Sequence, residues 1–365
     1  MAITGPISQR IDMLRFLMIF GVVVVHTQIF APANAMPYGW YPDILAFFQD
    51  AVFRCTVPLL SLVSGYCLYM SGLDTRIRDL IVRKARTLLV PFLVFNLGLL
   101  LADFLAYQVA GRSLVLDPPA MDTQAWLSAA FAIYSSPINF PLYFLRDLMV
   151  LVVLAPLFGW ILRRAALPGL IGIAALFLTD MDGYLILRGD MPVEFYLGGM
   201  LALRKVDLAR ADKYAYPALG VFLAACVGVT WFDWPILLPL RIVSPFLIWP
   251  IGAALVATAA GQWLIRQSRY SFFIFITHAP VLMVLWTANK YAGRPLPEHA
   301  FPVIAPFLAV ALLIAIYRVA ASVAPVSFAM VTGARASAKV RRERRVASAA
   351  PGMWPAENER RVAVL

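Results

Sequence analysis

The feature that most constrains this chain is a series of long apolar segments, which recur from the N-terminus almost to the C-terminus. Several run for about 18 residues or more, enough to cross roughly 30 Å of hydrocarbon at about 1.5 Å per helical residue. Hydrophobic residues make up 62% of the 365 residues and charged residues only 14%, whereas soluble domains have about 45–50% and about 25%. A soluble core cannot account for this excess, so we predict that a lipid bilayer surrounds most of the chain.

The apolar segments predict an all-α fold, a polytopic transmembrane bundle of about ten helices. The expected spans are residues 12–30, 44–71, 87–109, 141–161, 167–180, 193–203, 214–231, 238–260, 271–290 and 301–322. The fifth and sixth are short for a complete crossing, and we expect them to be tilted, broken or partly re-entrant. Residues 1–325 would form one transmembrane domain.

The basic residues between the spans predict the orientation of the bundle. One side receives Arg10, Arg15, Arg76, Arg78, Arg83, Lys84, Arg86, Arg163, Arg164, Arg204, Lys205, Arg210, Lys213, Arg266 and Arg269. The other side receives only Arg112, Arg188, Lys290 and Arg294. Because cytoplasmic loops are enriched in Lys and Arg, the first side is predicted to be cytoplasmic, with both termini inside. The net charge of +11 then reflects topology and does not indicate a nucleic-acid partner.

Residues 333–365 differ from the rest of the chain, because they lack an apolar period and carry basic residues among Ala, Ser and Pro. This composition predicts a disordered cytoplasmic tail, held near the anionic inner leaflet by about 1 kcal/mol per basic residue. The three cysteines, Cys55, Cys67 and Cys226, lie in apolar segments without a CxxC pattern or a neighbouring histidine. We interpret them as packing residues and predict no bound metal.

The first span contains two ionisable residues, Arg15 and His26, that share one helix face. They are separated by about three helical turns, or roughly 16 Å along the axis. Ionisable side chains within a span are rare and usually face the protein interior. Arg15 by itself is explained well enough as a positive anchor at the cytoplasmic end. For His26, the polar neighbours Thr27 and Gln28 favour a functional role over a simple hydrogen bond to another helix, since His is the usual general base near neutral pH.

The second span combines a proline with a Ser-Gly pair. Pro58 frees backbone carbonyls, and Ser64-Gly65 allows helices to approach closely or exposes backbone to a ligand. Ordinary small-residue packing explains the pair equally well. Just upstream, Asp50 and Arg54 have the i,i+4 spacing of an ion pair on one helix face, which would help Arg54 to enter the membrane.

Further charged and titratable residues lie at the start of, or within, later spans. Arg83 and Arg86, at the predicted cytoplasmic mouth of the third span, either form a positive-inside cluster or bind phosphate oxygens with their guanidinium forks. His278 is a second histidine inside a span, just before a proline. Arg146 and Arg241 open their spans from the outer side, where they either hold an anionic group or extend to the interface.

Together these patterns resemble the acyltransferase-3 family of bacterial integral membrane acyltransferases, over residues 8–322. The matching motifs are R-x-D-x-x-R from Arg10 to Arg15, Arg-x10-His ending at His26, Pro58 followed by Ser64-Gly65, R-x-x-R at Arg83 and Arg86, and S-F-x-I-x-x-x-H-x-P from Ser271 to Pro280. The chain departs from the family at Leu59-Leu60, often Phe-Phe, and at Tyr143, often Trp. Neither departure affects a candidate catalytic residue.

The resemblance implies that an acyl group passes from a cytoplasmic acyl-CoA to a sugar hydroxyl at the outer side of a bacterial inner membrane. The acceptor would be a cell-surface glycan or a lipid-linked oligosaccharide. Acyl-CoA would be the donor substrate, and no bound cofactor is implied. The overall pattern is most similar to the succinoglycan-type members, which succinylate or acetylate exopolysaccharides.

The resemblance also implies roles for individual residues. His26, Arg15 and Asp12 would be catalytic, with His26 acting either as general base or as a covalent acyl relay. Donor binding would fall to Arg83, Arg86, Ser64 and Gly65. Contacts to the acyl group or the acceptor would come from His278, Arg54, Arg146 and Arg241. If the acyl group is succinyl, one of these three arginines would pair with its free carboxylate.

A protein of another class, a transporter or flippase for a polar or lipid-linked substrate, would also use buried charges and a hydrated histidine. Transporters often show inverted repeats and paired broken helices, and the sequence shows neither. A structural membrane scaffold would leave His26 and His278 without a purpose.

Overall fold

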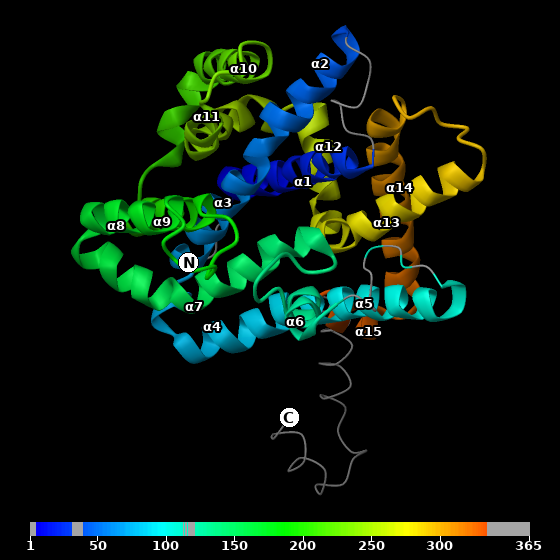
Figure 1. Cartoon of the computed structure of the whole chain (residues 1–365). Helices are drawn as coiled ribbons and strands as arrows, with labels where there is room; N and C mark the ends of the chain where they lie inside the picture. Colours follow the sequence, from blue (N-terminus) through cyan, green and yellow to red (C-terminus); the bar gives the residue numbers. More distant parts are fainter. Residues whose placement is uncertain (1–4, 31–38, 112, 114, 116–120, 334–365) are drawn as a thin grey trace, which may run out of the picture.

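The computed structural model describes residues 5–30, 39–111, 113, 115 and 121–333. Within these residues the chain is predominantly helical and contains no β-strand (Figure 1). The first half contains α1 (Pro6–His26), α2 (Trp40–Ala46), α3 (Thr56–Met70), α4 (Ile77–Lys84), α5 (Val90–Ala110), α6 (Thr123–Phe131) and α7 (Tyr143–Arg164). The second half contains α8 (Ala166–Leu178), α9 (Asp190–Leu203), α10 (Ala215–Trp231), α11 (Leu237–Val256), α12 (Ala259–Gln267), α13 (Ser271–Tyr291), α14 (Phe301–Val323) and α15 (Pro325–Val331).

Eight helical segments of the described chain are long and apolar enough to cross a membrane. They are Pro6–Ile29, Trp40–Met70, Ile77–Ala110, Phe140–Arg164, Leu208–Trp231, Leu237–Val256, Ala259–Tyr291 and Phe301–Val323. The predicted all-α polytopic bundle is therefore confirmed. The predicted fifth and sixth spans are also helices, but α8 and α9 have only 13 and 14 residues. At the helical rise each is about 20 Å long, too short for a straight crossing.

The short helix α9 is surrounded by protein. Its Phe195 and Tyr196 side chains are fully buried, and it packs along α3. At two glycines the backbones touch, because a Cβ atom on Gly65 would lie 2.1 Å from the Phe195 carbonyl oxygen, and one on Gly198 would lie 2.1 Å from the Leu62 carbonyl oxygen. A helix enclosed by other helices need not match the thickness of the bilayer, which explains why α9 can be short.

Helix α1 runs through the middle of the bundle (Figure 1) and contacts α3, α11, α12, α13 and α14. Met13, Leu14 and Val23 are almost completely buried. Arg10 of α1 is buried as well, and it pairs with Asp212 at 2.7 Å. We call the end of the bundle that holds His26 the outer end, and the end that holds Arg15 the cytoplasmic end, following the orientation predicted from the loop charges.

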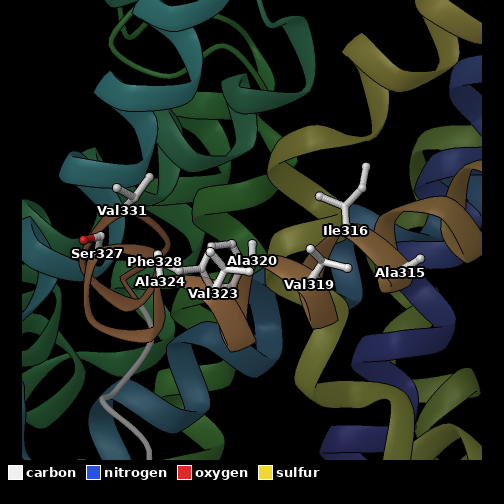
Figure 2. Close-up of a pocket in the computed structure, with 9 residues that line it drawn as sticks. All are labelled: Ala315, Ile316, Val319, Ala320, Val323, Ala324, Ser327, Phe328 and Val331. Carbon is white, nitrogen blue, oxygen red and sulfur yellow. The ribbon is translucent and has the colours of Figure 1, made fainter.

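The surface of α14 contrasts with this interior, since it exposes large apolar side chains such as Phe307, Val319 and Val323. Figure 2 shows an apolar groove of about 620 Å³ along α14 and α15. Its lining residues are Ala315, Ile316, Val319, Ala320, Val323, Ala324, Ser327, Phe328 and Val331. With one hydroxyl among these side chains, the groove suits lipid chains and offers no catalytic chemistry.

The structure describes no residue beyond Gly333. The predicted basic tail, residues 333–365, therefore lies almost wholly outside the described residues, as does Arg112 of the predicted outer loops. The boundary between the domain at 1–325 and this tail stays a prediction, and so does the cytoplasmic location of both termini.

Candidate active site

The structure brings together the two histidines that the sequence places inside spans. His26 at the end of α1 and His278 in the middle of α13 approach to 2.8 Å between Nδ1 of His26 and Nε2 of His278. Their ring centroids lie 5.0 Å apart and their planes are inclined by 19°, so the two rings meet edge to edge through these nitrogens. The residues are 252 positions apart in the chain, so sequence analysis identified both histidines without predicting that they form a pair.

The hydrogen bonds of His278 determine which nitrogen of His26 is free to act as a base. Nδ1 of His278 lies 2.8 Å from the Phe275 carbonyl oxygen and 3.1 Å from that of Ile274. Because a carbonyl oxygen only accepts, this nitrogen must carry the proton, and Nε2 of a neutral His278 must accept. His26 then donates from Nδ1. Its Nε2 is left with a free lone pair, which is the state required of a general base.

Pro280 makes possible a hydrogen bond that links the helix of His278 to the turn before α7. Pro280 has no N–H, so the carbonyl oxygen of Ile276, four residues earlier, loses its helical donor. Asn139 replaces that donor, with Nδ2 3.0 Å from the Ile276 oxygen. Asn139 is itself fixed, since its backbone N–H donates to Asn96 Oδ1 at 3.0 Å. These bonds tie the turn that precedes α7 to the helix that carries His278.

That turn supplies the aromatic side chains beside the histidines. Phe140 packs edge-on against His26, with ring centroids 4.9 Å apart. One helical turn further on, the Tyr143 ring lies beneath the guanidinium of Arg188, 5.2 Å from its centroid. From the sequence, Tyr143 stood out only as a family departure and Arg188 only as an outer-side charge. No local pattern marks these residues, because their positions depend on contacts with distant segments.

The predicted Asp50–Arg54 ion pair is confirmed, and it forms part of a polar network at the outer end of α1. Arg54 lies 3.2 Å from Asp50 and donates to Gln28 Oε1 at 2.9 Å. Gln28 donates in turn to Asp50 at 2.7 Å. Gln28 lies two residues beyond His26, so this network adjoins the end of α1 that carries the histidine. His26 is therefore part of a polar site at the outer end.

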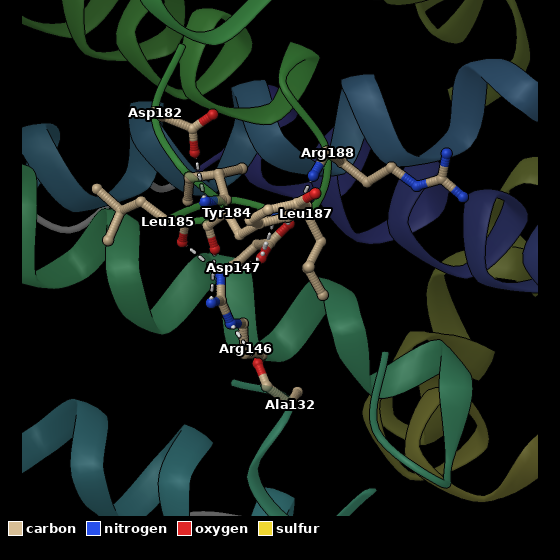
Figure 3. A network of polar contacts seen from close by, with 9 residues as sticks. Ala132, Arg146, Asp147, Asp182, Tyr184, Leu185, Leu187 and Arg188 are labelled. Atoms are coloured by element: carbon tan, nitrogen blue, oxygen red, sulfur yellow. Dashed lines mark hydrogen bonds and ion pairs between the residues drawn. The ribbon is translucent and has the colours of Figure 1, made fainter. Parts of the chain in front are cut away.

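Arg146 has a structural role in the loop before α9 (Figure 3). Its guanidinium bonds to Asp147 at 3.0 Å, to the carbonyl oxygens of Ala132 and Tyr184 at 3.1 Å each, and to that of Leu185. These bonds join the start of α7 to the loop before α9 and to Ala132 at the end of α6. Arg241 is likewise paired, with Asp190 at 2.7 Å. Both of these candidate substrate contacts are therefore engaged within the protein.

A pocket of about 610 Å³ lies at the outer end, next to the histidine site. Its described lining residues are Val115, Met121, Asp122, Ala125, Ala129, Ser135, Ser136, Pro137, Ile138 and Phe140. Phe140 thus faces this pocket and also contacts His26. The pocket combines hydroxyl, carboxylate and aromatic surfaces, a combination that suits a sugar.

At the cytoplasmic end the candidate residues are more loosely held. Arg15 pairs with Asp12 at 3.0 Å, and both side chains are more than one-third exposed, at 41% and 37%. Ser64 donates to the carbonyl oxygen of Leu60 in its own helix at 2.7 Å. Gly65 faces the backbone of α9, so its small size serves helix packing. Donor binding by Ser64 and Gly65 stays a prediction.

Arg83 lies in the last turn of α4 and Arg86 in the turn that joins α4 to α5, and both are exposed. Neither guanidinium has a hydrogen-bond or ion-pair partner among the described residues, so both can receive an anionic ligand.

In the described part of the chain, no group of three or more His, Cys, Asp or Glu side chains is arranged to hold a metal ion.

Fold and site together define a multi-pass membrane protein whose helices enclose a histidine-centred polar site. The chain belongs to the acyltransferase-3 family, since residues 8–318 match its acyltransferase domain. It is therefore a membrane acyltransferase, which favours the enzyme over the transporter alternative. The chain is 34% identical to the succinoglycan biosynthesis protein ExoH of Rhizobium meliloti (strain 1021), over 91% of this chain and 94% of that protein. No solved structure matches the chain.

Proposed function

We propose that this protein transfers a short acyl group from cytoplasmic acyl-CoA to a hydroxyl of an exopolysaccharide, or of its lipid-linked precursor, at a bacterial inner membrane. The observation that carries the proposal is the histidine pair, which leaves a basic Nε2 on His26. The relative's role in succinoglycan biosynthesis supports an exopolysaccharide acceptor. The outer pocket that reaches Phe140 supports entry of a sugar beside His26.

In the proposed reaction, His26 Nε2 removes the proton from the acceptor hydroxyl while that oxygen attacks the thioester carbonyl carbon. The new C–O bond forms, and the tetrahedral intermediate then collapses by breaking the C–S bond. The departing thiolate takes the proton back from His26. His278 accepts from His26 Nδ1 throughout, which keeps the ring in one tautomer and orientation, as the carboxylate does in a catalytic triad.

The second course is an acyl relay, in which Nε2 of His26 attacks the thioester carbonyl carbon, the C–S bond breaks, and the coenzyme A thiolate leaves an acyl-imidazole behind. The acceptor hydroxyl then attacks the acyl carbon, so that the C–O bond forms, the C–N bond to His26 breaks, and the hydroxyl proton neutralises the thiolate. Both courses use the same free nitrogen. Single-turnover experiments with radiolabelled acyl-CoA in the absence of acceptor distinguish them. Label retained on the protein but not on its His26→Ala variant would establish the relay.

The donor would approach from the cytoplasmic end. Arg83 and Arg86 are exposed there without partners among the described residues, and Arg15 lies in the N-terminal half of α1. Guanidinium groups suit the phosphates of a coenzyme A donor. In this proposal the acyl-CoA donor binds at the cytoplasmic end of the bundle and the sugar acceptor at the outer end.

Mass spectrometry of secreted and cell-surface glycans from cells with and without the protein tests the proposal. Loss of one acyl mass in the deletion strain, restored by wild type but not by His26→Ala, is the expected result. His299→Ala is the matched control, because this third histidine lies in the loop between α13 and α14, away from the pair. Unchanged glycan acylation in cells carrying a correctly inserted His26→Ala protein would refute the mechanism.

A further inference from the structure

The arginines near the histidine pair differ in one respect, which is whether the protein itself supplies their partner. Arg54 is paired with Asp50, and Arg241 with Asp190. Arg146 gives its donors to Asp147 and to loop carbonyls. Arg188 alone of this group has a guanidinium without a hydrogen bond or ion pair to any described residue, and its side chain is exposed.

The structure holds Arg188 in place by its backbone and leaves its side chain free. The carboxylate of Asp147 is completely buried and accepts from the backbone N–H groups of Leu187 at 3.1 Å and of Arg188 at 3.0 Å. The Arg146 guanidinium neutralises the same carboxylate at 3.0 Å. Figure 3 shows the Arg188 side chain extending away from this network. A buried ion pair thus fixes the loop, and the free cation projects from it.

The position of Arg188 relative to the base follows from the start of α7. Phe140 contacts His26, and Tyr143, one turn later, lies under the Arg188 guanidinium. The aromatic face stabilises the cation without neutralising it. An unpaired guanidinium beside a general base indicates that the substrate brings an anion to this point.

We propose that Arg188 binds a carboxylate on the transferred acyl group, so that the donor is the coenzyme A thioester of a short dicarboxylic acid such as succinate. The fork of the guanidinium matches the two oxygens of a carboxylate. Arg188 is not among the residues that line the outer pocket proposed for the sugar, which assigns the anion to the acyl group. This inference rests on the proposed function and identifies its donor. During transfer the far carboxylate stays unchanged, while the thioester C–S bond breaks and the ester C–O bond forms.

The test compares the purified, full-length protein and its variants with succinyl-CoA and with acetyl-CoA, using the glycan from the deletion strain as acceptor. For Arg188→Gln we expect a loss of about tenfold or more in kcat/KM with succinyl-CoA, mainly through KM, and a change within about twofold with acetyl-CoA. Arg188→Lys, which keeps the charge but not the fork, should lie between wild type and Arg188→Gln. Arg294→Gln is the matched control, because Arg294 is an exposed outer-side arginine that pairs with Glu298.

Several results would overturn the inference while leaving the proposed function intact. One is a wild-type protein that uses acetyl-CoA but not succinyl-CoA. Another is an equal loss with both donors, which would assign Arg188 a general role in stabilising the reaction or the fold. A third is a loss that appears only with acceptors that carry acidic sugars, which would assign the carboxylate to the glycan. If the wild-type protein transferred an acyl group from neither donor, by contrast, the proposed function itself would be refuted.

Discussion

The outer and cytoplasmic ends of the bundle both carry arginines, but the two ends are built differently. At the outer end, hydrogen bonds between distant segments fix the groups around His26, as shown by His278 on α13 and Asn139 before α7. At the cytoplasmic end, Arg83 and Arg86 are neighbours in sequence and have no internal partners among the described residues. Bond-making chemistry requires atoms held in fixed geometry, whereas attraction of a polyanionic donor requires charge. We therefore predict that substitutions at the outer end lower turnover strongly, whereas substitutions at the cytoplasmic end weaken donor binding only modestly.

The largest effect is expected at His278, because it holds the tautomer of His26. His278→Phe keeps an aromatic ring in the buried site but cannot accept from His26 Nδ1. Turnover should fall by about 100-fold to 10,000-fold, with little change in KM for the donor. Steady-state rates of the purified protein check this. A loss smaller than tenfold would mean that His26 does not need its partner.

A large effect on stability is expected at Gly65, where α3 touches α9. A methyl group 2.1 Å from the Phe195 carbonyl oxygen forces the two backbones apart, so Gly65→Ala should lower stability by about 1–3 kcal/mol. Gly98→Ala is the control, since nothing lies within 4 Å of a Cβ atom there. Thermal unfolding in detergent measures both variants. A Gly65→Ala protein of normal stability with a raised KM for acyl-CoA would favour the donor-binding role instead.

A moderate effect is expected at Asn139, which links the turn before α7 to α13. Asn139→Ala leaves the Ile276 carbonyl oxygen without its donor, which should lower stability by about 1–3 kcal/mol. It also loosens Phe140 against His26, and we expect turnover to fall by about tenfold. Asn289→Ala is the control. Asn289 lies on α13, as Ile276 does, and makes comparable bonds to Leu296 in the loop that follows the helix, away from the site. Equal turnover in the two variants would show that Asn139 serves stability alone.

The smallest effect is expected at Arg86, on the cytoplasmic end. Arg86→Ala should raise KM for acyl-CoA by about threefold to tenfold at low salt, with kcat unchanged. This difference should shrink as ionic strength rises, because salt screens exposed charges. Arg78→Ala, on the preceding helix, is the control for the loss of one positive charge. An equal rise in KM for both variants would indicate that the overall positive charge of this end attracts the donor, and that Arg86 does not form a specific site.

The sequence was sufficient for the fold class, because the length of an apolar segment and the bilayer thickness are related by the helical rise alone. The predicted spans lie mostly on helical residues, and eight of the ten correspond to segments of the described chain that are long and apolar enough to cross a membrane. It did not reveal how α9 is enclosed, since Gly65 and Gly198 show close contact only once α3 and α9 are brought together. His26 and His278 could be identified singly, because ionisable residues inside spans are costly and therefore rare.

The tertiary structure alone determined how these residues combine. The His26–His278 bond joins positions 252 residues apart, and no helical period relates them. The same holds for Arg188, whose importance depends on the buried Asp147 that fixes its backbone and on the absence of a partner among the described residues. Local spacing predicts which groups share one helix, but the packing of helices decides which cation is neutralised and which is left for a substrate. The presence of Arg15 and His26 on one helix could thus be predicted from the sequence, whereas the tautomer of His26 and the free cation beside it could not.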